Sequence, residues 1–478
     1  MNFFSFRADN LSVLFMAVIT VVFLCALIYS PEYMKGEKKS RLVRYYICYF
    51  LTWAVLMLLS CAASLITFYF CYELMTLVSF PLVLHEQTHE AVMAGLKYLL
   101  YSLCGAYMAL FGLFFLSRYA DGLAFQAGGS LNPELVSGHE TLLSFVLLFM
   151  ILGFSVKAGM FPMHAWLPTA HPIAPSPASA VLSGVIVKSG VLGIIRVIFY
   201  VFGPEFFRGS FVQMAVLILS LVTIFMGSML AYREKILKKR LAYSTVSQLS
   251  YILFGIFLLN EDAFAGSLLH ILMHAFIKSA LFLTAGALIH CTGFKEVDRF
   301  KGIGKKLPGL MWCYLFCSLS LIGIPPTGGF SSKWYLAAGA LSSRIPVFSY
   351  LGPVVLLLSA LLTAGYLLPI AVDAFFPGKG FDNAQFAHSS DCSVSRSQTC
   401  EWRTDEVSGL GSRGTSNAQA APAAVSAQDS WADIHPLSLS MLAPIAVLTV
   451  LGVAVGVFCG PLLNYIGEII RQAGGMGL

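Results

Sequence analysis

Residues 178–203 read ASAVLSGVIVKSGVLGIIRVIFYVFG, an apolar run of 26 residues with Lys188 near its centre. A helix of about 20 apolar residues crosses the roughly 30 Å hydrocarbon core of a bilayer. A charge at the bilayer centre costs at least about 2.5–3.5 kcal/mol. The run therefore predicts a membrane-spanning helix that buries its lysine among other helices.

Four more ionisable residues lie inside apolar runs of comparable length. They are Glu73 in 61–84, Lys157 in 141–167, Lys278 in 264–291 and Lys333 in 309–341. Ionisable residues at membrane depth face the protein interior and commonly mark ion or proton pathways. With Lys188, these residues predict a series of titratable groups that are buried inside the protein.

Composition places the chain among polytopic membrane proteins. Of its 478 residues, 58% are hydrophobic and only 11% are charged, whereas soluble domains carry about 25% charged residues. The net charge of +6 comes from basic residues in loops next to the apolar runs, so it indicates the lipid bilayer and no nucleic-acid partner. Eleven cysteines form no CxxC pair, which leaves no metal-ligand spacing.

Apolar runs of about 20 residues or more recur about twelve times without strict alternation, which predicts an all-α bundle and not a β-barrel. The expected spans are residues 11–30, 42–60, 61–84, 91–117, 141–167, 172–203, 211–232, 240–260, 264–291, 309–341, 347–373 and 437–460.

The expected spans divide the chain into segments. Residues 42–203 and 211–373 each hold five spans, and an odd number makes the second group enter from the opposite side, as an inverted repeat requires. Residues 1–41 hold the first span and a basic loop, and 437–478 hold the last span and a tail. Residues 378–435 are polar and of low complexity, which predicts a cytoplasmic loop.

Basic residues predict the orientation. They gather in the loops around Lys38, Lys238 and Lys305, whereas the intervening loops carry about one each. The positive-inside rule places the basic loops in the cytoplasm. With about twelve spans, both termini then lie outside.

Helix breakers accompany two of the lysines. Lys157 is followed by Gly159 and Pro162, and Lys333 is preceded by Pro325 and Pro326. Non-helical backbone at membrane depth survives only when it is buried in protein or lines a wet cavity, so discontinuous helices with charges at the break predict a transport path. The alternative is a packing kink with a lysine that snorkels to the interface.

His270, His274 and Lys278 follow one another at i, i+4 and i+8, so they share one helix face. Histidine titrates near neutral pH, which suits the three residues for proton transfer. The alternatives are polar side chains that bond between helices and haem ligation, which two neighbouring histidines on one helix disfavour. No motif for a flavin, nicotinamide or iron–sulfur site occurs, so we expect no cofactor on this chain.

Four segments carry a resemblance to a known family. They are KAGMFPMHAWLPTAH at 157–171, continuing to Lys188, then HILMHAFIKSALFL at 270–283, GIPPTGGFSSK at 323–333 and YELM at 72–75. These segments resemble the antiporter-like proton-pumping subunits of respiratory complex I, Mrp-type sodium/proton antiporters and energy-converting membrane hydrogenases. The resemblance covers about residues 10–375.

The resemblance implies a role for each buried group. Glu73 and Lys157 are the coupling ion pair. Lys188 and Lys278 are relay lysines, and His270 and His274 form the polar link between them. Lys333 is the terminal group that exchanges with the outside. The ions are protons or sodium, the other partners are further membrane subunits, and the location is a prokaryotic plasma (inner) membrane.

The chain departs from the family at its start, because members usually have two additional spans before the one matching 11–30. Either a small partner subunit supplies these helices, or the start is misassigned. The expected function is proton translocation, or sodium/proton exchange, within a redox-driven complex such as a complex I-like NADH:quinone oxidoreductase or a membrane hydrogenase. An Mrp-type antiporter without electron transfer is the first alternative, and a non-transporting membrane scaffold is the second.

Overall fold

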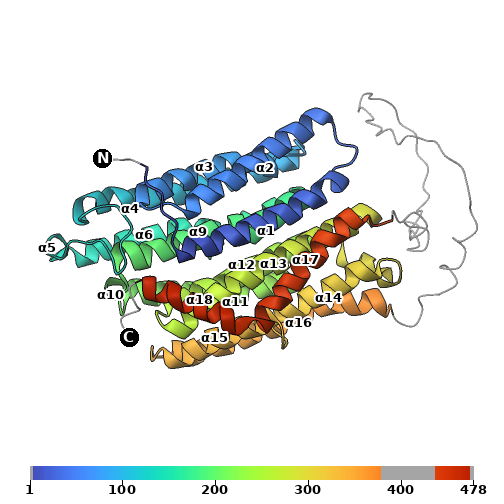
Figure 1. Ribbon diagram of the computed structural model, residues 1–478. Coiled ribbons are helices and arrows are strands. Elements are labelled where there is room, and N and C mark those ends of the chain that lie inside the picture. Colours follow the sequence, from blue (N-terminus) through green and yellow to red (C-terminus); the bar gives the residue numbers. More distant parts are fainter. Residues whose placement is uncertain (1–3, 378–435, 474–478) are drawn as a thin grey trace, which may run out of the picture.

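The computed structural model describes residues 4–377 and 436–473, and helices form nearly all of their regular structure. Most helices run roughly along one axis and form a bundle (Figure 1). The first part of the chain forms α1 Asn10–Tyr33, α2 Lys39–Ser60, α3 Leu65–Val83, α4 His89–Tyr119, α5 Pro133–Val136, α6 Glu140–Ala158, α7 Leu167–Ile173, α8 Ser176–Val181, α9 Lys188–Val197 and α10 Pro204–Phe207. Two π-helical turns, η1 Leu182–Ile186 and η2 Ile198–Phe202, join α8, α9 and α10.

The second part forms α11 Phe211–Arg233, α12 Leu237–Phe257, α13 Glu261–Thr292, α14 Pro308–Ile322, α15 Gly328–Ser342, α16 Phe348–Phe375, α17 Leu439–Val457 and α18 Cys459–Gln472. Short 3₁₀ turns, η3 Val297–Phe300 and η4 Ile303–Lys305, precede α14. Polar side chains start several helices, since Ser64, Thr88 and Asn260 each accept a backbone N–H of the first turn.

Ten helices of the described residues are long and apolar enough to cross a membrane, which confirms the all-helical membrane class. α12 falls outside this set and carries Lys238, Lys239 and Arg240 in its first turn. The region of Lys333 is divided between two shorter helices, α14 and α15. The total of twelve spans, the inverted repeat and the segment boundaries stay predictions. The predicted loop at 378–435 lies outside the described residues.

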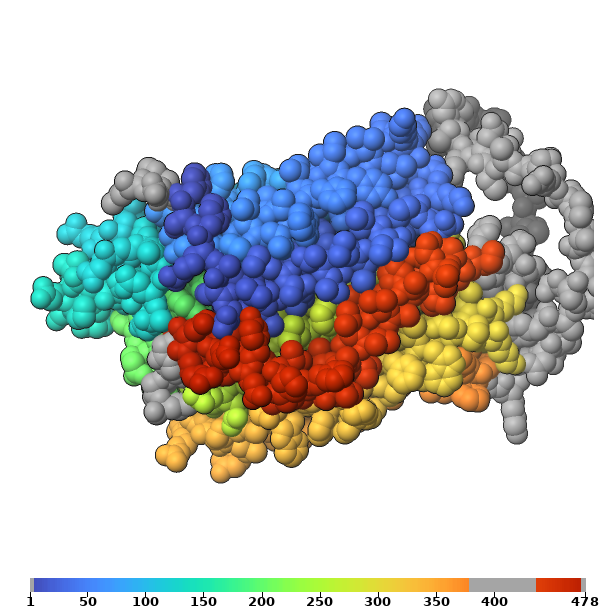
Figure 2. Space-filling view, in the orientation of Figure 1, coloured from blue at the N-terminus to red at the C-terminus, as the bar shows by residue number. Residues whose placement is uncertain are grey.

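Two helical segments form the centre of the bundle. The run from Ser176 to Phe202 and the whole apolar window of α13 are fully buried. A helix that is apolar on every side belongs in the interior, and these are the segments that carry Lys188, His270, His274 and Lys278. Around them, α17 and α18 cross the outer face between α1 and the α14–α15 region (Figure 2).

Two helices break where glycine and proline predicted it. α6 ends at Ala158 because Gly159 adopts a left-handed φ of 70°, and Gly323 does the same after α14 with a φ of 97°. The predicted spans 141–167 and 309–341 are each interrupted at the break that their glycine and proline residues indicated. At the first break, the indole of Trp166 donates to the carbonyl oxygen of Val156 at 2.7 Å, which satisfies a carbonyl at the end of α6.

The three basic loops meet at one end of the bundle. The loop after α11 pairs with the loop after α13 through the bridge between Ile236 and Glu296. The loop after α1 reaches the same end, because Glu37 and His290 line one cavity there. We call this end of the bundle the basic end.

Candidate functional site

Lys157 lies in the last turn of α6, directly before the break, and its side chain is fully buried. Its ammonium donates a hydrogen bond of 2.6 Å to the hydroxyl of Thr76 on α3. It also lies over the rings of Tyr72 and Tyr98, at 4.7 and 5.7 Å from their centroids. A cation over an aromatic face is favourable, and more so when water is excluded, so these groups hold the charge of Lys157 inside the bundle.

Glu73 lies on α3 three residues before Thr76 and is half-buried. Its Oε1 has no hydrogen-bond partner among the described residues. Glu73 and Lys157 interact electrostatically, but their charged atoms do not come within 4.0 Å, so no direct ion pair joins them. The structure thus brings the two residues into one neighbourhood, with Thr76 in direct contact with the lysine.

Lys188 begins α9, separated by one residue from the end of the π-helical turn η1, and it is 1% exposed. Its Nζ lies 2.8 Å from Nδ1 of His274 and donates to the carbonyl oxygen of Ser183 at 3.1 Å. That carbonyl belongs to the π-helical turn η1, and such turns often occur at functional sites. The arrangement aims the lysine across to α13.

Gly190 brings Lys188 close to the break in α6. A Cβ atom at Gly190 would lie 3.1 Å from the Cβ of Lys157 and would clash with the backbone of Phe154 and Ala158. α9 can therefore approach the end of α6 only because residue 190 has no side chain. Lys157 and Lys188 are anchored on two helices that touch at this point.

His274 and His270 continue the sequence of polar groups along α13. Their rings lie 6.1 Å apart with an interplanar angle of 23°. His270 Nδ1 contacts the hydroxyl of Ser332 on α15 at 2.9 Å, and its Nε2 contacts Oε1 of Gln248 on α12 at 3.1 Å. The two histidines thus extend the polar contacts from Lys188 to Ser332 on α15. Ser332 directly precedes Lys333 in the sequence.

Lys333 contacts the other break. Its Nζ donates to the carbonyl oxygens of Leu321 and Ile322 at 2.7 and 2.9 Å, which are end carbonyls of α14. A cation is favoured at a helix C-terminus. The same Nζ lies 5.1 Å from the ring centroid of Tyr251, and this ring stacks on His270 at 5.6 Å. Tyr251 therefore separates Lys333 from His270.

Lys278 is also fully buried, but it lies beside this sequence. Its Nζ donates to the carbonyl oxygen of Leu241 on α12 at 3.0 Å. It interacts electrostatically with Lys188 and His274, but it forms no hydrogen bond with either histidine. We call Lys157, Lys188, His274, His270 and Lys333 the polar row, with Lys278 next to its middle.

Sequence reasoning missed several members of this neighbourhood. Thr76, Gln248, Ser332 and Tyr251 are ordinary span residues in sequence, and only the fold brings them to the row. His171 on α7 is fully buried beside Lys278, and neither ring nitrogen has a hydrogen-bond partner among the described residues. His171 is the last residue of the segment 157–171 that carries the family resemblance. Its place in that segment could have marked it as a candidate site residue.

A second missed feature lies at the end opposite the basic loops. Arg196 on α9 forms two contacts with the carboxylate of Asp9, at 2.6 and 2.9 Å. Its guanidinium lies between the rings of Tyr200 and Phe125, at 4.7 and 5.4 Å. Arg196 lies in the same apolar run, 178–203, as Lys188. A buried arginine in such a run is as informative as a buried lysine.

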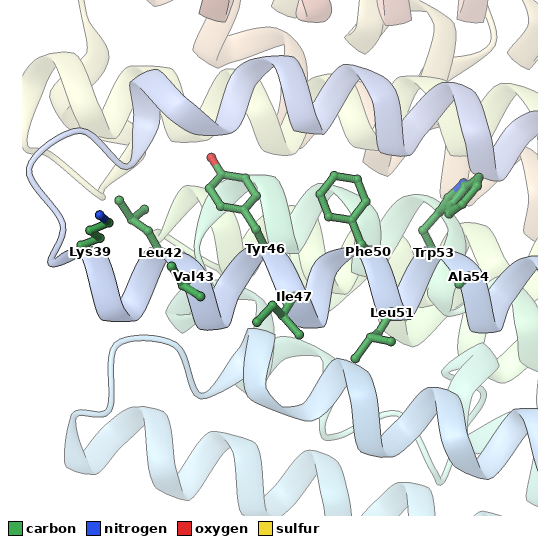
Figure 3. Close-up of a pocket in the computed structure, with 9 residues that line it drawn as sticks. All are labelled: Lys39, Leu42, Val43, Tyr46, Ile47, Phe50, Leu51, Trp53 and Ala54. Atoms are coloured by element: carbon green, nitrogen blue, oxygen red, sulfur yellow. The ribbon is translucent and has the colours of Figure 1, made fainter.

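The large surface grooves are separate from the polar row. One groove of about 710 Å³ follows α2, where Tyr46, Phe50 and Trp53 point to one side and Ile47 and Leu51 to the other (Figure 3). Its lining is mostly apolar, with Lys39 as its one charged side chain. No cluster of three metal-binding side chains occurs in the described ranges. The polar row lies inside the bundle, apart from this groove.

The arrangement defines a class of protein: a helical membrane protein with a row of buried cationic and imidazole groups that crosses its interior between two broken helices. Residues 62–362 match the model of the transmembrane family described as NADH:quinone oxidoreductase/Mrp antiporter. Residues 3–46 match the N-terminus of chain 5 of NADH-ubiquinone oxidoreductase (complex I). The chain belongs to the NADH:quinone oxidoreductase/Mrp antiporter family, and the predicted family resemblance is confirmed.

Two relatives show the breadth of this family. NADH-quinone oxidoreductase subunit N from Desulforudis audaxviator (strain MP104C) is 32% identical over 366 residues, which cover 76% of this chain and 71% of that protein. Hydrogenase-4 component B from Escherichia coli (strain K12) is 31% identical over 346 residues, which cover 69% of this chain and 50% of that protein. The chain thus spans about half the length of the second relative.

The fold also matches solved structures. In the structure of the Mrp complex from Dietzia sp. DQ12-45-1b, one chain superposes with a TM-score of 0.78 at 22% identity, covering 98% of this chain and 84% of that one. At this level of identity the match establishes the fold.

Proposed function

We propose that this chain translocates protons along the polar row as an antiporter-like subunit of a redox-driven membrane complex. The observation that carries the proposal is the contact of 2.8 Å between Lys188 Nζ and His274 Nδ1. Both side chains lie on the two fully buried helical segments. An N–H donor and an imidazole nitrogen at hydrogen-bond distance can exchange a proton with little motion of heavy atoms.

The neighbouring contacts support transfer in both directions from this pair. Gly190 brings Lys157 next to α9 on one side. On the other side, His270 connects through Ser332 and Tyr251 to the region of Lys333. Lys278, next to the middle of the row, is a second relay lysine. Protons are the primary ion of this proposal, and sodium is the alternative ion.

Further membrane subunits cover the face around Glu73 in this proposal. The carboxylate is half-buried on α3, and Phe70 and Leu77 on the same helix are 49% and 57% exposed. A charged group is costly against lipid, whereas a neighbouring subunit could supply polar partners. A change in the distance between Glu73 and Lys157 would then change the proton affinity of the lysine. The proposal assigns no redox centre to this chain, so electrons would travel on other subunits.

The proposal includes an orientation of the chain in the membrane. The basic end faces the cytoplasm of a prokaryotic cell, because Lys and Arg accumulate there. Protons then enter the row from the cytoplasmic side and leave near Lys333.

The test uses vesicles that hold the whole complex, with proton uptake driven by its electron donor and assembled complex quantified alongside. Glu73→Gln, Lys157→Ala and His274→Ala should each suppress proton uptake strongly without loss of assembly. Glu73→Asp should retain part of the activity, because it keeps the charge and shortens the reach. A matched control is His139→Gln, which changes a histidine on the exposed surface. If Glu73→Gln and His274→Ala both pump at the wild-type rate, the row is structural and the proposal is wrong.

A further inference from the structure

A polar cavity of about 210 Å³ lies at the basic end, apart from the polar row. Four ionisable side chains line it: Glu37 from the loop after α1, His85 and Glu86 from the loop after α3, and His290 near the end of α13. Tyr33, Met34, Pro175 and Ile289 complete the lining. None of these residues belongs to the buried row, and none was singled out in the sequence.

His85 is the most unusual group in this cavity. Its side chain is 2% exposed, and neither ring nitrogen has a hydrogen-bond partner among the described residues. Its Nε2 lies 3.9 Å from Oε1 of Glu37. The ring packs edge-on against Tyr45, with centroids 5.3 Å apart, and Arg44 donates to its main-chain oxygen at 3.0 Å. Buried polar atoms normally have a partner, so an imidazole with both nitrogens open beside a carboxylate indicates a binding site.

The charges around His85 favour passage of a proton over its retention. Burial lowers the pKa of His85, the carboxylate of Glu37 opposes this effect, and the positive charges of Arg44 and Arg41 reinforce it. Glu86 and His290 face the cavity from the same loop and from α13. His85 is therefore largely neutral near neutral pH, and it readily gives up a proton that it has taken from water.

One stripe of α13 connects the cavity to the relay lysines. Ser279, Leu283, Gly286 and His290 follow at spacings of four, three and four residues, so they share one face of the helix. His290 lines the cavity, and Ser279 follows directly after Lys278. The twelve residues from Lys278 to His290 span about 18 Å of helix.

Hydroxyl groups accompany this stripe. The Ser176 hydroxyl donates to the Tyr33 hydroxyl at 3.2 Å, and the Tyr29 hydroxyl donates to the carbonyl oxygen of Leu283 at 3.0 Å. A Cβ atom at Gly286 would clash with the Ser176 side chain and lie 2.9 Å from the Tyr29 hydroxyl. The absence of a side chain at Gly286 thus leaves room for both hydroxyls between the cavity and Lys278.

We propose that this cavity is a proton-loading site, in which His85 takes a proton from water at the basic end, Glu37 stabilises the imidazolium and the proton passes along α13 to Lys278. Only N–H and O–H bonds form and break in this step. The inference rests on the proposed function, because it assigns the entrance of the same pathway. The loading site is nevertheless separate from the polar row. The inference can therefore be wrong even if the polar row transports protons.

The experiment measures initial rates of donor-driven proton uptake in vesicles that hold the whole complex, as a function of the pH on the uptake side. His85→Gln removes the titratable group and keeps hydrogen-bonding capacity. Its rate should match the wild type at acid pH and fall about tenfold at alkaline pH, because uptake then depends on the scarce free protons. His89→Gln is the matched control, since His89 is exposed at the start of α4 and does not line the cavity. It should follow the wild-type profile.

Two further variants keep the result interpretable. If His85→Gln reduces assembly, the double variant Glu37→Gln, Glu86→Gln tests the same cavity and should show the same alkaline loss. His274→Ala should abolish uptake at every pH, and its outcome reports on the proposed function alone, because His274 contacts Lys188 and lies outside the route from the cavity to Lys278. A wild-type pH profile for His85→Gln, or for the double variant where His85→Gln does not assemble, would overturn the loading site. An equal loss at every pH in assembled complex would also overturn it, since it would indicate a structural role.

Discussion

Replacing Asp9 by asparagine tests how strongly the buried ion pair with Arg196 stabilises the fold. Asp9 caps the first turn of α1, because its Oδ1 accepts the N–H of Ser12 at 2.8 Å. The same carboxylate binds the guanidinium of Arg196 at 2.6 and 2.9 Å. Arg196 is 3% exposed. Asparagine remains a good cap but leaves the arginine without its counter-charge.

The structure sets the expected magnitude. Removing one partner of a buried ion pair leaves an uncompensated charge and costs about 3–5 kcal/mol. Asp9→Asn should therefore lower the free energy of unfolding by about this amount, and Asp9→Ala by about 1 kcal/mol more, because the cap is also lost. Combining Asp9→Asn with Arg196→Leu should recover part of the loss, since both charges are then absent.

Unfolding of the purified chain in mixed detergent and SDS micelles, followed by tryptophan fluorescence or circular dichroism, measures these differences. Asp121→Asn is the control, because Asp121 is an exposed aspartate in the loop after α4. A change below about 1 kcal/mol for Asp9→Asn would refute the reasoning, since this is the range of exposed ion pairs. It would mean that water or lipid headgroups solvate Arg196 once Asp9 is neutral.

Further outcomes follow from other contacts. Thr76→Val should reduce proton uptake and destabilise the chain by about 1.5–3 kcal/mol, because Lys157 loses its acceptor; Thr76→Ser should keep both properties, and equal behaviour of the two variants would contradict this. Burial alone would raise the pKa of Asp9, but Arg196 outweighs it and holds this pKa below its ordinary value. Asp9 therefore stabilises the fold above pH about 4 and loses this effect in more acidic solution, so the acid sensitivity of unfolding should be weaker in Asp9→Asn. Cysteines introduced near Lys38 and Lys238 should resist an impermeant thiol reagent added to intact cells, whereas cysteines near Gly129 and Gly209 should react; the reverse pattern would invert the orientation.

The helices were predictable because the bilayer imposes one simple rule on the sequence. A run such as 178–203 has to be helical and apolar, so Lys188 stood out as a buried charge before any contact was known. The breaks after Lys157 and before Lys333 were predictable for a similar reason, since glycine and proline at membrane depth interrupt a helix. The end points were less certain, because Gly159 ends α6 nine residues before the end of the predicted span 141–167.

The partners of the buried charges were not predictable from the sequence. Asp9 and Arg196 lie 187 residues apart, and no local pattern connects them. Thr76 and Ser332 are small polar residues of a kind that occurs throughout the spans. Only the packing of α3 on α6 and of α15 on α13 brings them to Lys157 and His270. The order of the row is likewise a tertiary property, because periodicity grouped Lys278 with the histidines, whereas the fold turns it toward Leu241.

The complete burial of the segment from Ser176 to Phe202 has a consequence for biosynthesis. This segment packs against α13, yet α13 is complete only after a further 90 residues, from Gly203 to Thr292, have been synthesised. At roughly 5–20 residues per second, the ribosome needs about 5–18 s for that stretch. During this interval Lys188 and Arg196 lack the covering helix that shields Lys188 in the finished bundle. The nascent segment therefore depends on the insertion machinery or on earlier helices to shelter its charges, and a pause in translation before α13 would prolong that exposure.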